Sequence, residues 1–194
     1  MNLQKSTLYK FAELLDECKT ARLTGTRGAE EIFNLQISDC EESIKFLPES
    51  GNVIDVGSGG GLPGIVWAVC RPDLKITLLD SINKKCSAMK NIVDALEIKN
   101  VEIVCSRCED FAKVNSRIFD LACARAVASA EITIELLEPL VKIGGKIMTF
   151  KGKKVHEEIS QADKKLRKLK LTKPELNFYG GEDSSKCIVI WRKK

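Results

Sequence analysis

Histidine is nearly absent from this chain, and its cysteines lack the spacing of a metal centre. The 194 residues include one histidine, His156, and eight cysteines, of which only Cys105 and Cys108 form a C-x-x-C pair. A structural zinc site needs a second such pair or nearby histidines. We therefore expect no metal site, and we interpret the cysteines as reduced thiols that pack as small apolar side chains.

Long apolar runs and a signal peptide are also missing. No apolar run is long enough to cross a bilayer, and the N-terminal segment MNLQK is polar overall, without the apolar core of an export signal. We expect a cytoplasmic protein with no membrane partner. A chain of this length is sufficient for one well-packed domain with some additional structure.

The net charge of +4 conceals an uneven distribution along the chain. Residues 142–194 contain 15 Lys and Arg against 6 Asp and Glu, whereas the remainder contains 16 against 21. A cationic C-terminal part beside an acidic remainder is consistent with an anionic macromolecular partner such as RNA. A merely solvated helix surface explains the same pattern and stays open as the alternative.

The order of apolar and amphipathic segments predicts an α/β fold. Helices are expected over 2–18, 30–47, 65–70, 83–96, 131–140 and 156–169, and strands over 53–56, 74–79, 101–104, 119–123, 146–150, 171–179 and 186–191. Strands that alternate with helices favour a parallel sheet, and the last two strands, with no helix between them, should pair antiparallel. The predicted domains are an N-terminal helical extension, 1–48, and a sheet domain, 49–194.

A glycine-rich turn after the first strand is the most informative segment. Residues 53–56 are suited to a strand buried on both faces, and four of the next five residues are glycine, which lets a ligand approach the backbone closely. Pro63 fits the first turn of the following helix. Open α/β sheets bind ligands at this edge.

Two kinds of cofactor fit this turn. Residues 59–64 match the dinucleotide fingerprint G-x-G-x-x-G, whereas residues 55–61 match the acidic-x-G-x-G-x-G pattern of S-adenosylmethionine-dependent methyltransferases. Asp80, at the end of the second strand, can bind ribose hydroxyls in either case. Three features favour the methyltransferase. Asp55 stands before the glycines, the carboxylates of Asp80 and Glu109 would attract a sulfonium and repel phosphate, and the chain ends in a predicted hairpin.

Several separate motifs then resemble one family. DVGSGGGLPGI (55–65) resembles the signature of the bacterial 16S ribosomal RNA guanine N7 methyltransferases, the RsmG family, also called glucose-inhibited division protein B. The similarity continues in LLDSINKK (78–85), SRCEDF (106–111), FDLACARAVA (119–128) and the pair Lys151-Gly152. Upstream, Leu23-Thr24-Gly25 and Asp39 are similar to the family's N-terminal segments, so the resemblance covers nearly the whole chain.

The resemblance implies a Rossmann-like class I methyltransferase with a seven-stranded, mostly parallel sheet and an antiparallel C-terminal hairpin. It implies methyl transfer from S-adenosyl-L-methionine to N7 of a guanine in 16S rRNA of the small ribosomal subunit, by a monomer without a DNA partner. Arg22, Gln36 and Cys40 depart from the usual Asn, His and Ser, so no detailed role follows for the N-terminal helices.

The resemblance also assigns site residues. Gly57, Gly59 and Leu62 should line the cofactor and Asp80 should accept the ribose hydroxyls; the alternative for Asp80 is a cap for the next helix. Cys108 and Glu109 should flank the adenine, unless they lie in an exposed loop. Arg125, the expected catalytic residue, should contact the methionine carboxylate or the target nucleotide, unless it forms a surface salt bridge. The candidate RNA-binding residues are Lys151, Lys153, Lys154 and Lys173.

Other functions stay open at this point. A methyltransferase for another RNA or a small substrate would use the same cofactor residues, and a dinucleotide-binding oxidoreductase or a non-catalytic RNA-binding factor would use part of them.

Overall fold

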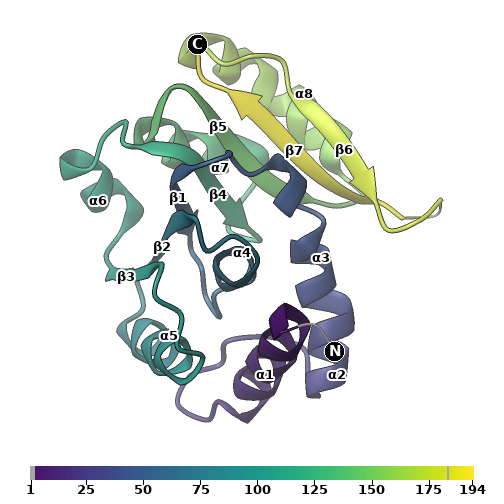
Figure 1. The fold of residues 1–194 in the computed structure, drawn as a ribbon. Coiled ribbons are helices and arrows are strands. Elements are labelled where there is room, and N and C mark those ends of the chain that lie inside the picture. The colour runs from purple at the N-terminus through teal and green to yellow at the C-terminus, as the bar shows by residue number, and fades with distance from the viewer. Residues whose placement is uncertain (1–2, 183) are drawn as a thin grey trace. The chain divides into compact units, whose positions relative to one another are not determined.

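The computed structural model describes residues 3–182 and 184–194, except for the side chains of residues 163–167. The chain divides into two compact units, Met1–Arg107 and Cys108–Lys194, which are described one after the other (Figure 1). The predicted boundary between residues 48 and 49 stays a prediction.

The first unit begins with helices. α1 spans Leu3–Glu17 and buries Leu8, Phe11 and Leu15. The predicted second helix is a composite of α2 (Ala29–Glu31), a π-helical turn (Ile32–Ile37), α3 (Ser38–Glu41) and a 3-10 turn (Ile44–Phe46). Such π-helical turns inside helices are rare and are frequent at functional sites.

Three parallel strands follow, in the order β3-β2-β1. β1 spans Gly51–Val56, β2 Leu74–Asp80 and β3 Val101–Cys105. The helices between them are α4, Gly64–Cys70, and α5, Asn83–Ala95. Val56 pairs with Leu79 and Asp80 with Cys105, so the carboxyl ends of all three strands lie at one edge, from which the glycine turn emerges.

The core of this unit lies between the strands and α4. Val53 and Ile54 of β1 are fully buried, as a strand covered on both faces should be. Trp67 of α4 is also fully buried, and its indole N–H donates to the Ser43 hydroxyl at 2.7 Å. α4 packs against β2 and also against α1 and α3 (Figure 1), which anchors the N-terminal helices on the glycine turn's own helix.

The second unit contains four strands in the order β4-β5-β7-β6. β4 (Phe119–Arg125) and β5 (Val141–Lys151) are parallel, and β7 (Lys186–Arg192) pairs antiparallel with both β5 and β6 (Glu175–Tyr179). Its helices are α6 (Cys108–Val114), α7 (Ala130–Leu137) and α8 (Val155–Leu166), with 3-10 turns at Glu138–Leu140 and Arg167–Leu169.

The predicted fold class is confirmed: the seven strands form a mostly parallel sheet with an antiparallel C-terminal hairpin. Three local predictions were wrong. The segment 107–110, for which the sequence predicted no helix, is mostly the start of α6, whose first turn carries Glu109 and Asp110, acidic residues that favour a helix N-terminus. The strand expected over 171–179 begins only at Glu175. β5 starts at Val141 rather than near residue 146. In the described part of the chain, no helix has both the length and the apolar character needed to span a bilayer.

Candidate functional site

The glycine turn is bonded to the neighbouring strand. The N–H groups of Gly57 and Ser58 both donate to the Leu79 carbonyl, at 2.8 and 3.1 Å. The Gly61 N–H donates to the Ser58 carbonyl at 2.7 Å. Gly57 and Gly59 have φ values of 69° and 56°, a region that residues with a side chain rarely adopt. The turn is therefore held in one shape at the carboxyl edge of β1 and β2.

Asp80 is the buried carboxylate of this edge. Its side chain is attached to the turn, because Oδ2 accepts the Gly59 N–H at 2.9 Å, and Oδ1 accepts the Ile82 N–H just before α5, also at 2.9 Å. The residue is 6% exposed. A carboxylate oxygen can accept a second hydrogen bond, so both oxygens keep capacity for hydroxyl donors such as those of a ribose.

Asp55 has a structural role that the sequence did not suggest. It is 1% exposed, and Oδ2 accepts the Gly64 N–H at 3.0 Å, at the start of α4. A Cβ on Gly64 would lie 2.2 Å from Leu78 Cδ2 and 3.1 Å from Asp55 Oδ2. One oxygen of this carboxylate thus binds the backbone of the helix that follows the turn, and the expectation that Asp55 favours a cationic ligand stays a prediction.

The loop between α1 and α2 packs onto the glycine turn, which sequence reasoning missed. A Cβ on Gly60 would lie 2.7 Å from the Leu23 carbonyl oxygen and 3.1 Å from Leu15 Cδ2. The Gln36 amide donates to Thr24 Oγ1 at 2.7 Å and to Thr26 Oγ1. Thus Gln36, in the π-helical turn, holds the loop that covers the glycine turn. The signals in the sequence were the departure at Gln36 and the family-like Leu23-Thr24-Gly25 in this loop.

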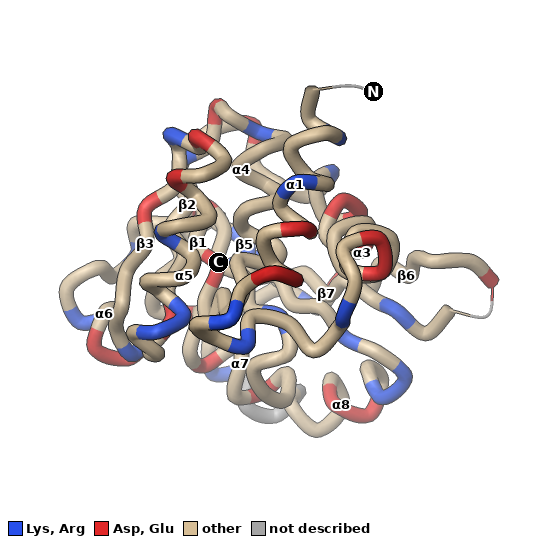
Figure 2. Tube along the Cα trace, turned by 90° about the horizontal axis from the view of Figure 1, so that it is seen from below, with Lys and Arg blue, Asp and Glu red and all other residues tan. Residues whose placement is uncertain are grey.

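Cys108 and Glu109 open α6 of the second unit. Cys108 is 8% exposed and its thiol donates to the Leu136 carbonyl at 3.4 Å. Burial, with a smaller contribution from Glu109, raises the pKa of this thiol to about 11, so it stays protonated near neutral pH. Glu109 is exposed, and Figure 2 shows charges of both signs along α6.

Arg125 ends β4, with its guanidinium carbon 5.7 Å from the centre of the Phe150 ring. The loop that follows it is braced by an ion pair. Lys151 Nζ lies 2.8 Å from Glu158 Oε2 and donates to the Ala128 carbonyl at 2.8 Å, while Glu158 Oε2 accepts the Ala130 N–H at 2.9 Å.

This ion pair changes the interpretation of the lysines. The Lys151 side chain is only 8% exposed, so its charge is directed at Glu158 rather than at a surface where RNA phosphates could bind. Lys153, Lys154 and Lys173 are exposed. No group of three metal-ligating side chains occurs among the residues that the structure describes.

Comparison with known sequences identifies one family. The family model described as GidB, rRNA small subunit methyltransferase G, matches residues 4–187. A Petrotoga mobilis protein named ribosomal RNA small subunit methyltransferase G is 40% identical over 90% of this chain and 78% of its own length. A protein of the same name from Thermotoga neapolitana is 32% identical over the whole of this chain and 86% of its own length.

Solved structures share the fold at low sequence identity. A SAM-dependent O-methyltransferase from Thermotoga maritima is 16% identical, with a TM-score of 0.64 over 84% of this chain and 70% of that one. A Streptococcus mutans protein described as a methyltransferase, in complex with SAH, is 17% identical, with a TM-score of 0.58 over 79% of this chain and 97% of that one. These likenesses concern the fold.

Proposed function

The chain belongs to the GidB family of rRNA small subunit methyltransferases G, and from this premise we propose that it methylates N7 of a guanine in 16S rRNA. The methyl donor is S-adenosyl-L-methionine. The observation that carries the proposal is the match over residues 4–187, together with a glycine turn and a buried carboxylate at the edge where such sheets bind ligands.

The first unit fits the adenosine part of this cofactor. Asp80 is buried and its two oxygens already point at backbone donors of the turn, so ribose hydroxyls would complete its hydrogen bonds. Gly57 and Gly59 present a backbone without side chains, and Leu62 lies in the same turn, 9% exposed. We propose that these four residues hold the ribose and the adjoining chain of atoms.

The second unit supplies the remaining proposed contacts. Cys108, through its backbone, and Glu109 would flank the adenine, because a helix N-terminus offers free N–H groups to ring nitrogens. Arg125 is proposed to contact the methionine carboxylate or the target nucleotide. These assignments rest on the family motifs that contain the three residues.

When bound, S-adenosylmethionine supplies an activated methyl group on a sulfonium. Guanine N7 carries a free lone pair at neutral pH, so its attack needs no general base. The single histidine, His156, lies outside the motifs, in agreement with that chemistry. What the protein contributes is then the alignment of N7 with the methyl group and the exclusion of water.

The substrate proposed is the assembled or nearly assembled small ribosomal subunit, bound by a monomer. Exposed Lys153, Lys154 and Lys173 would contact phosphates, which gives affinity and salt dependence but little sequence discrimination. Lys151 is left out because of its ion pair with Glu158.

The test uses purified protein, radiolabelled S-adenosylmethionine and small subunits that lack the N7 methyl group. We expect label in 16S rRNA and, after digestion, 7-methylguanosine by mass spectrometry. Subunits that already carry the modification are the control and should accept none. Transfer to a small metabolite instead of that RNA would refute the proposal.

A further inference from the structure

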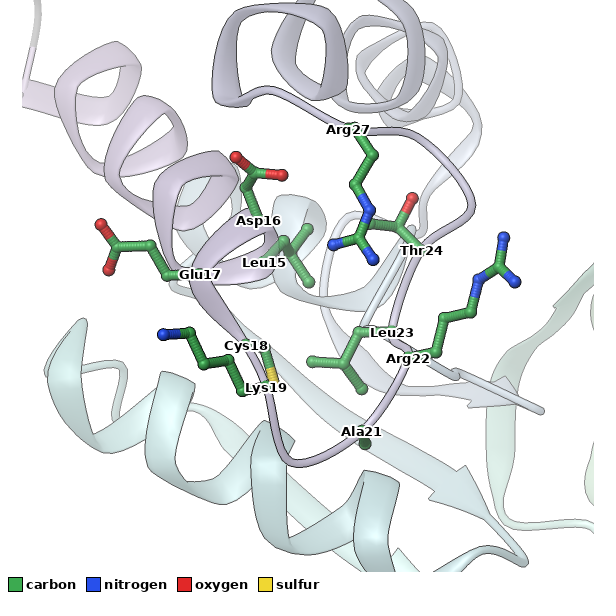
Figure 3. A pocket seen from close by; sticks show the side chains of 10 residues that line it. All are labelled: Leu15, Asp16, Glu17, Cys18, Lys19, Ala21, Arg22, Leu23, Thr24 and Arg27. Atoms are coloured by element: carbon green, nitrogen blue, oxygen red, sulfur yellow. The ribbon is translucent and has the colours of Figure 1, made fainter.

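A pocket of about 370 Å³ lies in the first unit between the end of α1 and the loop that covers the glycine turn. Its volume is within the usual range of small-molecule sites. Leu15, Leu23 and the Cys18 thiol give it an apolar side, and Arg27 and Thr24 stand together opposite them (Figure 3). It therefore combines a surface on which a flat base can pack with a polar side.

The polar side presents hydrogen-bond donors. Thr24 Oγ1 accepts hydrogen bonds from the Gln36 amide at 2.7 Å and from the Thr26 N–H at 3.1 Å. Two acceptor positions are all that a hydroxyl has, so its own hydrogen must donate elsewhere. Among the residues that the structure describes, neither Arg22 nor Arg27 has an ion-pair partner.

The Cys18 thiol at the edge of the pocket is held by its own neighbours. Burial acts to raise the pKa of this thiol, but hydrogen bonds with the Thr20 side chain and with the backbone of Ala21 and Thr20 outweigh it, and the pKa is lowered. The Arg27 guanidinium and the Thr24 hydroxyl, which stand together in the pocket, favour an anion as its ligand.

Two carboxylates also border the pocket, Asp16 and Glu17, against the three cations Lys19, Arg22 and Arg27. Asp16 Oδ1 accepts the Gly28 N–H at 2.9 Å, and the Glu17 side chain points away from the pocket (Figure 3). The bond to Asp16 ties the end of the loop at Gly28 to α1, and Gln36 holds Thr24 and Thr26 within the loop, so the pocket is formed before a ligand arrives. The loop also contacts Gly60 of the glycine turn through Leu23, which places the pocket beside the proposed cofactor residues.

We propose that this pocket binds one nucleotide of the RNA substrate, with a backbone phosphate on Arg27 and Thr24 and the base against Leu15 and Leu23. Arg22 extends outward from the rim (Figure 3) and contacts the neighbouring phosphate of the same strand. The inference rests on the proposed function, since it takes RNA as the substrate. A free anion and a phosphate of an RNA strand share this chemistry, and the test separates them.

The test compares Arg27→Ala with Lys10→Ala, a control that removes one exposed cation of α1. For unmethylated small subunits, Arg27→Ala should raise the KM at least roughly tenfold, as the loss of a charged hydrogen bond does. It should reduce the slope of log affinity against log salt by about one. The affinity for S-adenosylhomocysteine by calorimetry should not change, and Arg27→Lys should recover most of the loss.

Two results would overturn the inference directly: a KM and salt slope equal to those of Lys10→Ala, or a parallel loss of S-adenosylhomocysteine affinity. Inhibition of the wild type by millimolar inorganic phosphate that Arg27→Ala escapes would overturn it only if the salt slope of subunit binding is the same in both proteins, because the pocket would then bind a free anion and not an RNA phosphate. Filter binding of both variants to the subunits is measured as well. If the wild type transfers no methyl group, the proposed function fails, and the binding data still decide whether Arg27 contacts RNA.

Discussion

Replacing Asp80 by asparagine tests two roles of this carboxylate, which are to stabilise the glycine turn and to bind the cofactor. The two carboxylate oxygens accept the N–H groups of Gly59 and Ile82, each at 2.9 Å. Asparagine has one oxygen for two donors, so in Asp80→Asn the amide NH₂ group must face one of these N–H groups. One charge-assisted hydrogen bond is lost and two donors oppose each other.

The magnitude follows from that lost bond. A hydrogen bond to a charged group contributes about 1.5–3 kcal/mol, and Asp80 is 6% exposed, so solvent does not compensate. For a domain of this size each kcal/mol lowers Tm by about 2–4 °C, which gives a decrease of about 3–12 °C. If the same carboxylate binds the ribose, S-adenosylhomocysteine should bind roughly 10- to 150-fold more weakly.

Differential scanning calorimetry and isothermal titration calorimetry measure the two effects. The control is Asp94→Asn, which makes the same chemical change at an exposed position of α5 and should leave both Tm and affinity unchanged. The reasoning about the ribose is refuted if Asp80→Asn binds S-adenosylhomocysteine within twofold of Asp94→Asn.

Three further predictions concern packing, the loop and pH. Gly64→Ala places a Cβ 2.2 Å from Leu78 Cδ2 and should lower Tm by about 2–12 °C in calorimetry, from overpacking of about 1–3 kcal/mol; an unchanged Tm would contradict the packing. Gln36→Ala removes the hydrogen bonds that hold the loop over the glycine turn and should weaken S-adenosylhomocysteine binding. Gln36→His should restore part of the lost affinity. Titration calorimetry measures both affinities, and an affinity of Gln36→Ala equal to that of the wild type would contradict the role of the loop. Burial raises the pKa values of the Cys70 and Cys108 thiols from 9.0 to about 11. As the pH rises, the unfolded chain therefore loses these two protons before the folded chain does. In urea unfolding, the contribution of these thiols to the free energy of unfolding should be constant below about pH 9 and should fall toward about pH 11. The double variant Cys70→Ala, Cys108→Ala should make that decline less steep, while Cys86 and Cys187, whose pKa values burial also raises, keep part of it; equal slopes would contradict the assignment.

The sequence alone sufficed for features that depend on neighbouring residues. The strand before the turn, the glycines with positive φ and Asp80 at the end of β2 are all found where the pattern predicts them, because backbone preferences and strand ends are local properties. The terminal hairpin was equally predictable, since two strands without a helix between them pair antiparallel.

Contacts between distant residues were not predictable in the same way. The bond from the Gly64 backbone to the Asp55 carboxylate was not predicted. Lys151 was counted with the surface lysines, yet its partner is Glu158 in the next helix. The type of a charged residue does not determine which group it will bind. Its burial and its partner are set only when elements from different parts of the chain pack together.

The sequence by itself therefore determined the class of fold, the family and the position of the glycine turn, since these depend on the order and type of residues along the chain. Only the tertiary structure decided that Gln36 holds the loop over Gly60 and that this loop encloses a pocket of its own. The physical reason is that hydrogen bonds between side chains and the walls of a pocket exist only once helices and loops distant in sequence lie at contact distance.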